Sequence, residues 1–137
     1  PAGSLGAQLT TVEDIMITGS RIPFVNENIK TQKALKVLSQ KNLGILVVRN
    51  KKRKTIGIIT DGQIRRVSQK NLTFQSLQVK EIMTKNPIFI DRNTLAAKAL
   101  TLMNNKKITS LLVCNKKKPT VTIGVIHVHN ILLSNIT

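Results

Sequence analysis

The chain has 137 residues, of which 41% are hydrophobic, with a single cysteine and a formal net charge of +16. This composition is typical of a globular protein that buries a core without metal or disulfide staples, and it excludes disordered and fibrous classes. The apolar stretches, such as residues 45–48, are far shorter than the roughly 20 residues that a membrane-spanning helix needs. With no signal peptide recognisable, we expect a soluble cytoplasmic protein with Cys114 reduced and buried.

The charge balance is 22 Lys and Arg against 6 Asp and Glu. Such an excess favours an anionic partner: nucleic acid, a lipid surface or a phosphorylated ligand. A second explanation is base composition, because Lys, Ile and Asn, which have A/T-rich codons, make up 45 of the 137 residues. The chain has no Trp or Tyr for base stacking, so we expect neither a nucleic-acid nor a membrane partner. The basic runs 51–54 and 116–118 are interpreted as solvated turns.

In chain order, the first predicted elements are a short extended segment over residues 22–25 and a helix around residues 34–38. Two β-branched runs follow at residues 43–48 and 55–59, and the intervening basic turn predicts that they pair as buried strands of a hairpin. Residues 60–62 are expected to end the second strand and to begin another helix.

The same order is predicted again further along the chain. Residues 87–90 contain a proline and are expected to be extended. Asn93 is the predicted N-cap of the next helix. One face of that helix is expected to carry Leu95, Ala99, Leu102 and Met103.

The chain contains an internal repeat. Residues 12–16 recur as residues 79–83, and residues 56–59 recur as residues 123–126, both at an offset of 67. Between these anchors the offset falls to 64 and 65, as insertions in turns allow. Each copy therefore predicts a β-α-β-β-α unit of about 60 residues. A unit of this size buries too little core to be stable alone, so we expect it to pack against the other copy.

Candidates for catalysis or metal binding are few. The two histidines, His127 and His129, would point to one face of a strand, but no third ligand lies nearby, so we expect no metal site. There is no nucleophile triad, phosphate-binding glycine loop or obvious carboxylate pair. We therefore expect no catalytic residues.

The chain resembles the tandem CBS-domain pair, or Bateman module, of the C-terminal half of bacterial arabinose-5-phosphate isomerases. The strings that carry the resemblance are residues 14–16, 41–44, 57–62, 65–66, 81–84, 107–110 and 124–129. The resemblance implies an α/β (α+β) fold, in which two β-α-β-β-α CBS repeats pack about a pseudo-twofold axis. It divides the chain into three parts. Residues 1–11 are a linker from a missing sugar-isomerase (SIS) domain, residues 12–77 are repeat 1, and residues 78–137 are repeat 2.

The resemblance implies a parent enzyme that interconverts D-ribulose 5-phosphate and D-arabinose 5-phosphate for 3-deoxy-octulosonate and lipopolysaccharide synthesis. Because the catalytic domain is absent, we expect regulation rather than catalysis from this chain. The resemblance also implies a homodimer formed through the CBS helices, and a tetramer in the full-length parent. No cofactor is required, but a regulatory nucleotide is expected, either an adenine nucleotide or a cytidine monophosphate sugar. The alternative is a structural dimerisation module with vestigial sites.

In CBS pairs that bind adenosine nucleotides, the second long strand ends in Gly-apolar-apolar-Thr/Ser-x-x-Asp, and the Asp binds the ribose hydroxyls. Gln63 and Asn130 occupy that position in the two copies. A neutral hydrogen bond contributes about 0.5–1.5 kcal/mol against about 1.5–3 for a charged one, so ribose affinity is expected to fall roughly tenfold per site. The exchange either weakens binding or retunes it for another sugar.

The remaining site candidates also follow from this resemblance. The strand ends and the helix start are expected to contribute Ile22, Pro23, Thr60, Asp61, Pro87, Ile88 and His127. Lys41, Arg65 and Lys107 are the candidate phosphate partners. Each has a simpler interpretation: Thr60 as a helix N-cap, the proline segments as strand edges and the basic side chains as solvated.

Overall fold

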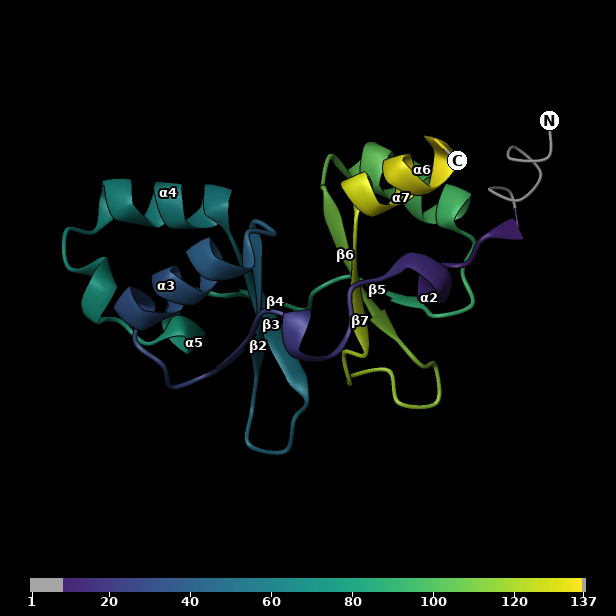
Figure 1. The fold of residues 1–137 in the computed structure, drawn as a ribbon. Coiled ribbons are helices and arrows are strands. Elements are labelled where there is room, and N and C mark those ends of the chain that lie inside the picture. The colour runs from purple at the N-terminus through teal and green to yellow at the C-terminus, as the bar shows by residue number, and fades with distance from the viewer. Residues whose placement is uncertain (1–8, 137) are drawn as a thin grey trace. The chain divides into compact units, whose positions relative to one another are not determined.

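The computed structural model describes residues 9–136. Most of the linker expected over residues 1–11 lies outside this range. The chain forms two compact units (Figure 1): one holds residues 20–87, and the other joins the chain up to Gly19 with the chain from Ile88 onwards. We call them the 20–87 unit and the 88–137 unit.

The 20–87 unit contains a four-stranded sheet in the order β1-β2-β3-β4. β1 runs parallel to β2, and the other neighbours are antiparallel. The strands are β1 (Phe24–Asn26), β2 (Ile45–Arg49), β3 (Thr55–Thr60) and β4 (Thr84–Lys85), and the helices are α3 (Thr31–Lys41), α4 (Asp61–Lys70) and α5 (Val79–Ile82). The predicted hairpin and the helix start after Thr60 are confirmed.

The 88–137 unit repeats this plan. Its sheet has the order β5-β6-β7, with β5 parallel to β6 and β6 antiparallel to β7. Its elements are α2 (Val12–Ile15), β5 (Phe89–Asp91), α6 (Ala96–Lys106), β6 (Ser110–Cys114), β7 (Gly124–His127) and α7 (Val128–Ile136). An antiparallel bridge between Ile17 and Val125 lies at the edge of this sheet. It is equivalent to the pairing of β4 with β3 in the other unit.

Two details of α6 correct the sequence analysis. The helix begins at Ala96 with Leu95 as the N-cap residue, so the prediction that Asn93 is the N-cap was wrong. Asn93 instead lies in the preceding turn, where its backbone N–H donates to Asp91 Oδ2 at 3.0 Å. Leu95 is 42% exposed, whereas Ala99 and Met103 are buried as predicted.

Each unit has a core between its sheet and its helices. The core of the 20–87 unit consists of Val25, Ala34, Leu38, Leu46, Val48, Ile59 and Val79. That of the 88–137 unit consists of Val12, Ile90, Ala96, Ala99, Met103, Leu111, Val113, Ile126 and Ile131. Cys114 is buried as predicted, and the two basic runs are exposed in turns.

Each core draws one buried residue from the other copy of the repeat. Val12 belongs to the 88–137 core and Val79 to the 20–87 core, and each starts a four-residue helix. The segments that follow these helices pack against a glycine in the third strand of the sheet. A Cβ on Gly57 would lie 2.8 Å from the Thr84 carbonyl oxygen and against Met83, and one on Gly124 would lie 3.1 Å from the Ile17 carbonyl oxygen and against Met16.

We predict that Gly57→Ala destabilises the protein by about 1–3 kcal/mol, because the added methyl group meets backbone atoms that cannot move aside freely. The matched control is Gly62→Ala in the first turn of α4, where the nearest atom is the flexible end of Arg66 at 3.3 Å. That change should be neutral, or stabilising by about 0.5–1 kcal/mol. Thermal unfolding followed by circular dichroism measures both, and equal midpoints would contradict the prediction.

Candidate functional site

In the 20–87 unit, the predicted site residues meet where β3 ends and α4 begins. Thr60 is extended, and its Oγ1 accepts a hydrogen bond from Gln63 N at 3.3 Å, so it caps the helix. Asp61 N donates to the Gly44 carbonyl at 3.1 Å. Gly44 has φ +70°, and a Cβ there would lie 3.2 Å from Asp61 Oδ2, so the carboxylate closes over this glycine. Gly44 was not predicted as a site residue. The signal that could have found it is a glycine directly before a run of buried, mostly β-branched residues.

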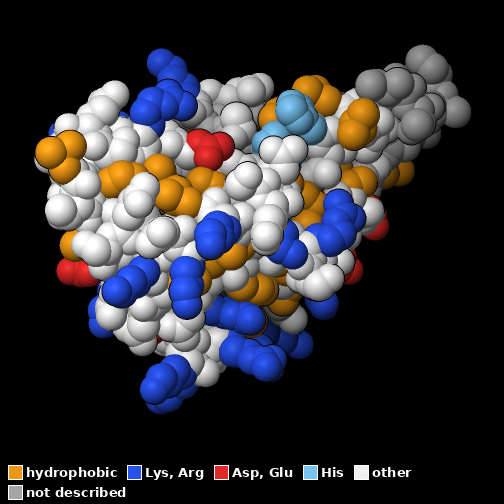
Figure 2. All heavy atoms as spheres, turned by 60° about the vertical axis from the view of Figure 1, so that its left-hand side comes forward, with side chains coloured by type: hydrophobic (Ala, Val, Ile, Leu, Met, Phe, Trp, Pro, Cys, Tyr) orange, Lys and Arg blue, Asp and Glu red, His pale blue; other side chains and the backbone are white. Residues whose placement is uncertain are grey.

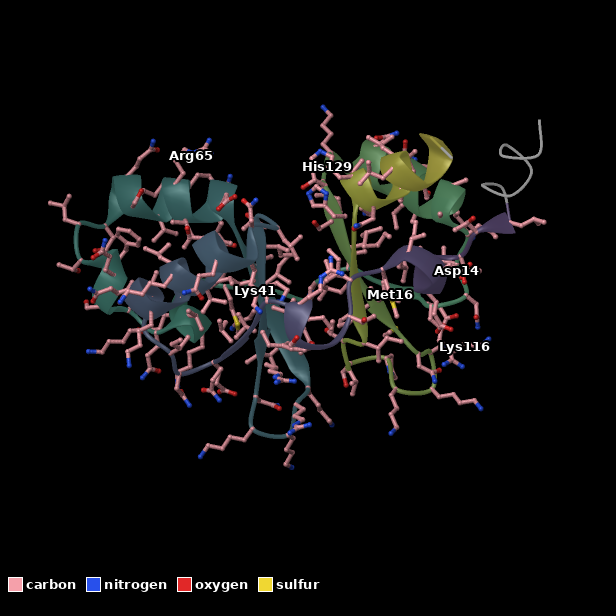
Figure 3. All side chains as sticks on the ribbon, viewed as in Figure 1. Asp14, Met16, Lys41, Arg65, Lys116 and His129 are labelled. Carbon is pink, nitrogen blue, oxygen red and sulfur yellow. The ribbon has the colours of Figure 1, made fainter. Side chains whose placement is uncertain are left out.

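The segment that leads into β1 is fixed by hydrogen bonds within the same unit. Lys41 Nζ donates to the Ser20 carbonyl at 2.6 Å, and Val47 N donates to the Pro23 carbonyl at 2.9 Å. Ile22 and Pro23 are buried. Lys41 therefore holds the backbone of a predicted site segment, a contact that the sequence did not reveal (Figure 3).

Gln63, which the sequence resemblance places where a ribose-binding carboxylate is expected, has a structural role. Its side-chain Nε2 donates to the Ile82 carbonyl, and its Oε1 accepts from Thr84 Oγ1 at 3.1 Å. The amide thus ties α4 to the end of α5 and to the start of β4. A carboxylate could not donate to the Ile82 carbonyl, so the amide suits this tie.

In the 88–137 unit, His127 and Asn130 form the start of α7. His127 N donates to Asn130 Oδ1 at 2.9 Å, and His129 N donates to His127 Nδ1 at 3.1 Å. These two bonds satisfy backbone N–H groups that would otherwise lack partners at the helix start. The two imidazole rings lie 4.6 Å apart between centroids.

This arrangement corrects the expectation that the two histidines share one face of a strand. His127 ends β7, whereas His129 lies in the first turn of α7. Among the described residues there is no group of three or more His, Cys, Asp or Glu side chains placed to hold a metal ion.

Ser110 is a polar residue at this end of the sheet that the sequence analysis did not select. It pairs with His127 across β6 and β7, which places both side chains on one face of the sheet. Its Oγ is buried, and it is the one buried side-chain nitrogen or oxygen in the described chain without a hydrogen-bond partner. The equivalent pair in the 20–87 unit is Ile45 and Thr60, which is less polar.

Within residues 9–136, the remaining predicted site residues have no side-chain hydrogen bond to the residues at the ends of β3 and β7. Arg65 stands on the exposed side of α4 (Figure 3). Lys107 ends α6 in the left-handed conformation with φ +57°. The Ile88 carbonyl accepts from Leu112 N at 3.3 Å, as the Pro23 carbonyl does in the other unit, and Pro87 is the last residue of the 20–87 unit.

Two sequence segments match a known family model. Residues 12–70 and 79–134 each match the model described as the CBS domain. The chain belongs to the CBS-domain family. The CBS pair is 38% identical over 137 residues to arabinose 5-phosphate isomerase of Salmonella typhimurium, covering 99% of this chain and 41% of that protein. It is also 36% identical over 132 residues to an uncharacterised protein of Rickettsia prowazekii, covering 96% of this chain and 40% of the relative.

Solved structures share the fold of this CBS pair. CBSX2 of Arabidopsis thaliana in complex with AMP aligns with a TM-score of 0.79 and 21% identity, covering 92% of this chain and 96% of that one. The CBS pair of MJ0100 with 5-methylthioadenosine and S-adenosylmethionine aligns with a TM-score of 0.78 and 23% identity, covering 94% and 99%. The described helices include none long and apolar enough to cross a membrane.

The stability of the CBS pair should fall as the pH is lowered from about 8 to about 5.5. Burial, and to a smaller extent His129, lowers the pKa of His127. The unfolded chain therefore binds a proton at His127 first, near pH 6.5, and protonation favours unfolding. Protonated Nδ1 also could not accept the hydrogen bond from His129 N.

Thermal unfolding across this pH range measures the effect. His127→Ser keeps an oxygen that can cap α7 but does not titrate, so its unfolding midpoint should vary less with pH. His129→Gln is the matched control and should retain most of the pH dependence. A wild-type midpoint that stays constant over the range would contradict the role assigned to His127.

The two amides should respond differently to replacement by a carboxylate. Gln63→Glu loses the donor to the Ile82 carbonyl and places a charge beside it, so we predict destabilisation of about 1–3 kcal/mol. Asn130→Asp keeps the oxygen that accepts from His127 N and adds a negative charge at a helix N-terminus, which should stabilise by about 0.3–1 kcal/mol. Chemical denaturation at pH 7 compares them, and destabilisation of similar size in both variants would refute the distinction.

Proposed function

We propose that this CBS pair is the ligand-sensing regulatory part of an arabinose 5-phosphate isomerase. The support is 38% identity over 99% of this chain to the enzyme of Salmonella typhimurium, of which the match spans 41%. The parent enzyme interconverts D-ribulose 5-phosphate and D-arabinose 5-phosphate in the cytoplasm, for 3-deoxy-octulosonate and lipopolysaccharide synthesis. The isomerase chemistry belongs to the rest of the parent, and this pair reports the concentration of a small molecule to it.

The ligand we propose is an adenine nucleotide, and a cytidine monophosphate sugar is the competing candidate as the activated end product. Structures of CBS domains with the same fold contain AMP, ATP, and 5-methylthioadenosine with S-adenosylmethionine. Those ligands share an adenosine group. A phosphate would be favoured by the 22 cationic side chains of the chain and by the positive end of a helix dipole at a helix start.

The observation that carries the proposal is the unpartnered hydroxyl of Ser110 beside His127. A buried hydroxyl without a partner costs about 1–3 kcal/mol, and a bound ligand that supplies the partner recovers this loss. Ser110, His127 and Asn130 give the 88–137 unit a polar strand end. In the 20–87 unit, Ile45 replaces the serine, and both polar atoms of the Gln63 amide are bonded, whereas the Asn130 amide is bonded through its oxygen alone among the described residues. We infer that the 88–137 unit provides the stronger site.

A second candidate function is a structural module that dimerises the parent. Leu132 and Leu133 of α7 are 46% and 64% exposed, and an apolar helix face favours a homodimer formed through the CBS helices, with a tetramer in the full-length parent. The bonded amide of Gln63 favours this function as well, because it leaves less of the 20–87 site for a ribose.

The test is thermal unfolding with AMP, ADP, ATP, CMP and the CMP-activated 3-deoxy-octulosonate sugar. A ligand at 100 times its dissociation constant adds about 2.7 kcal/mol, which raises the midpoint by several degrees. We predict that Ser110→Ala raises the midpoint of the free protein and reduces the ligand-induced shift. Ser39→Ala, on the exposed side of α3, should change neither.

Silence of the wild-type protein toward all five ligands, with a dimer in sedimentation analysis, would support the structural module instead. A ligand-induced shift that survives Ser110→Ala unchanged would place the ligand elsewhere in the pair.

A further inference from the structure

The positive charge is unevenly divided between the two units. The 20–87 unit holds 15 of the 22 Lys and Arg residues and 3 of the 6 acidic residues, for a net charge of +12 against +4 in the other unit. The units have nearly equal lengths, and a bias in codon composition alone predicts similar numbers in both. The 20–87 unit is therefore the more cationic part of the chain.

The acidic side chains do little to neutralise these cations. Asp14 and Glu81 accept hydrogen bonds from backbone N–H groups at helix starts, and Asp91 accepts two in turns. The one ion pair in the described chain joins Arg92 and Glu13, both in the 88–137 unit. All of residues 20–87 are described, and none of their cations forms an ion pair.

The most concentrated group of cations is the loop between β2 and β3, Asn50–Lys54, which we call the basic tip. Asn50 Oδ1 accepts from Lys52 N at 3.0 Å and from Lys54 N at 3.1 Å. Asn50 N also donates to the Lys54 carbonyl, and Arg53 N donates to the Asn50 carbonyl. The backbone of the tip is thus fixed by Asn50, while its four cationic side chains are exposed.

The loop between β6 and β7 repeats this design. Asn115 stands 65 positions after Asn50, its Oδ1 accepts from Lys117 N at 3.1 Å, and Lys116, Lys117 and Lys118 are exposed. Here Asp91 Oδ1 accepts from Lys116 N at 2.9 Å, which places a carboxylate at the base of the loop. Figure 2 shows many Lys and Arg side chains and few Asp and Glu side chains on the surface that it views.

We propose that the basic tip binds the phosphate backbone of double-stranded nucleic acid without reading its sequence. Lysine and arginine side chains on a two-stranded β ribbon suit the phosphates that flank a groove. The tip has no apolar side chain to anchor in a lipid bilayer, and the chain has no Trp or Tyr to stack on the bases of a single strand. This function differs from the one expected from composition alone, and it is independent of nucleotide sensing.

The test measures the anisotropy of a labelled DNA duplex of about 20 base pairs, titrated with the whole chain at roughly 50 to 200 mM salt. The tip variant is Lys51→Gln/Lys52→Gln/Lys54→Gln, which leaves Arg53 in its left-handed conformation with φ +63°. The matched control is Lys33→Gln/Lys36→Gln/Lys70→Gln, which removes the same charge from exposed positions on α3 and α4. Thermal unfolding verifies that both variants fold.

We expect the wild type to bind with a steep salt dependence. The tip variant should lower the slope of log affinity against log salt by about 3, and its affinity at roughly 100 mM salt by more than tenfold. The control should lose about threefold or less. Lys116→Gln/Lys117→Gln/Lys118→Gln should have a smaller effect than the tip variant, because Asp91 partly offsets that loop.

Three results would overturn the proposal. Equal losses in the tip variant and the control would mean that binding reflects diffuse charge. The absence of duplex binding at roughly 50 mM salt would remove the function altogether. Capture by phosphatidylglycerol vesicles without duplex binding would identify an anionic membrane surface as the partner in its place.

Discussion

The organisation of both units depends on one close approach, that of a methionine-containing segment to a glycine in the third strand. Because Gly57 and Gly124 lack a Cβ, Met83 and Met16 pack directly against the sheet and the following residue bonds to its edge. These contacts join the two sequence motifs that recur at an offset of 67. The shared offset thus reflects a single packing interaction, whereas the intervening loops are free to differ in length.

At the strand ends, single side chains also serve the fold directly. Residues at the nucleotide-site positions of the family also complete the fold: Thr60 caps α4, Gln63 ties α4 to β4, and Asn130 with His127 begins α7. A ligand in the 20–87 unit would have to compete with bonds that are already made. In the 88–137 unit, by contrast, the hydroxyl of Ser110 is still without a partner. The two copies of one repeat therefore differ in which polar groups at their strand ends are hydrogen-bonded.

Sequence patterns predicted the hairpins, the helix start at Thr60 and the buried cysteine, because alternation and helix periodicity are local signals. They failed at Asn93, which lies in a turn held by the bond from its backbone N–H to Asp91, two residues before the N-cap residue Leu95. Several predicted site residues, such as Thr60 and His127, lie at strand ends, and their role in binding stays a prediction. Their bonding partners, such as Ile82 for Gln63 and Ser20 for Lys41, lie 19 and 21 positions away, and no local pattern indicates such contacts.

The distribution of the repeats over the two units bears on how such a chain arose. Each unit completes its core and sheet edge with a short segment from the other copy: Val12 to Ile17 in one case and Val79 to Lys85 in the other. A single ancestral copy would carry one such segment and one sheet able to receive it. Two such chains could exchange their segments by reciprocal domain swapping, and gene fusion would then make the exchange permanent within one chain.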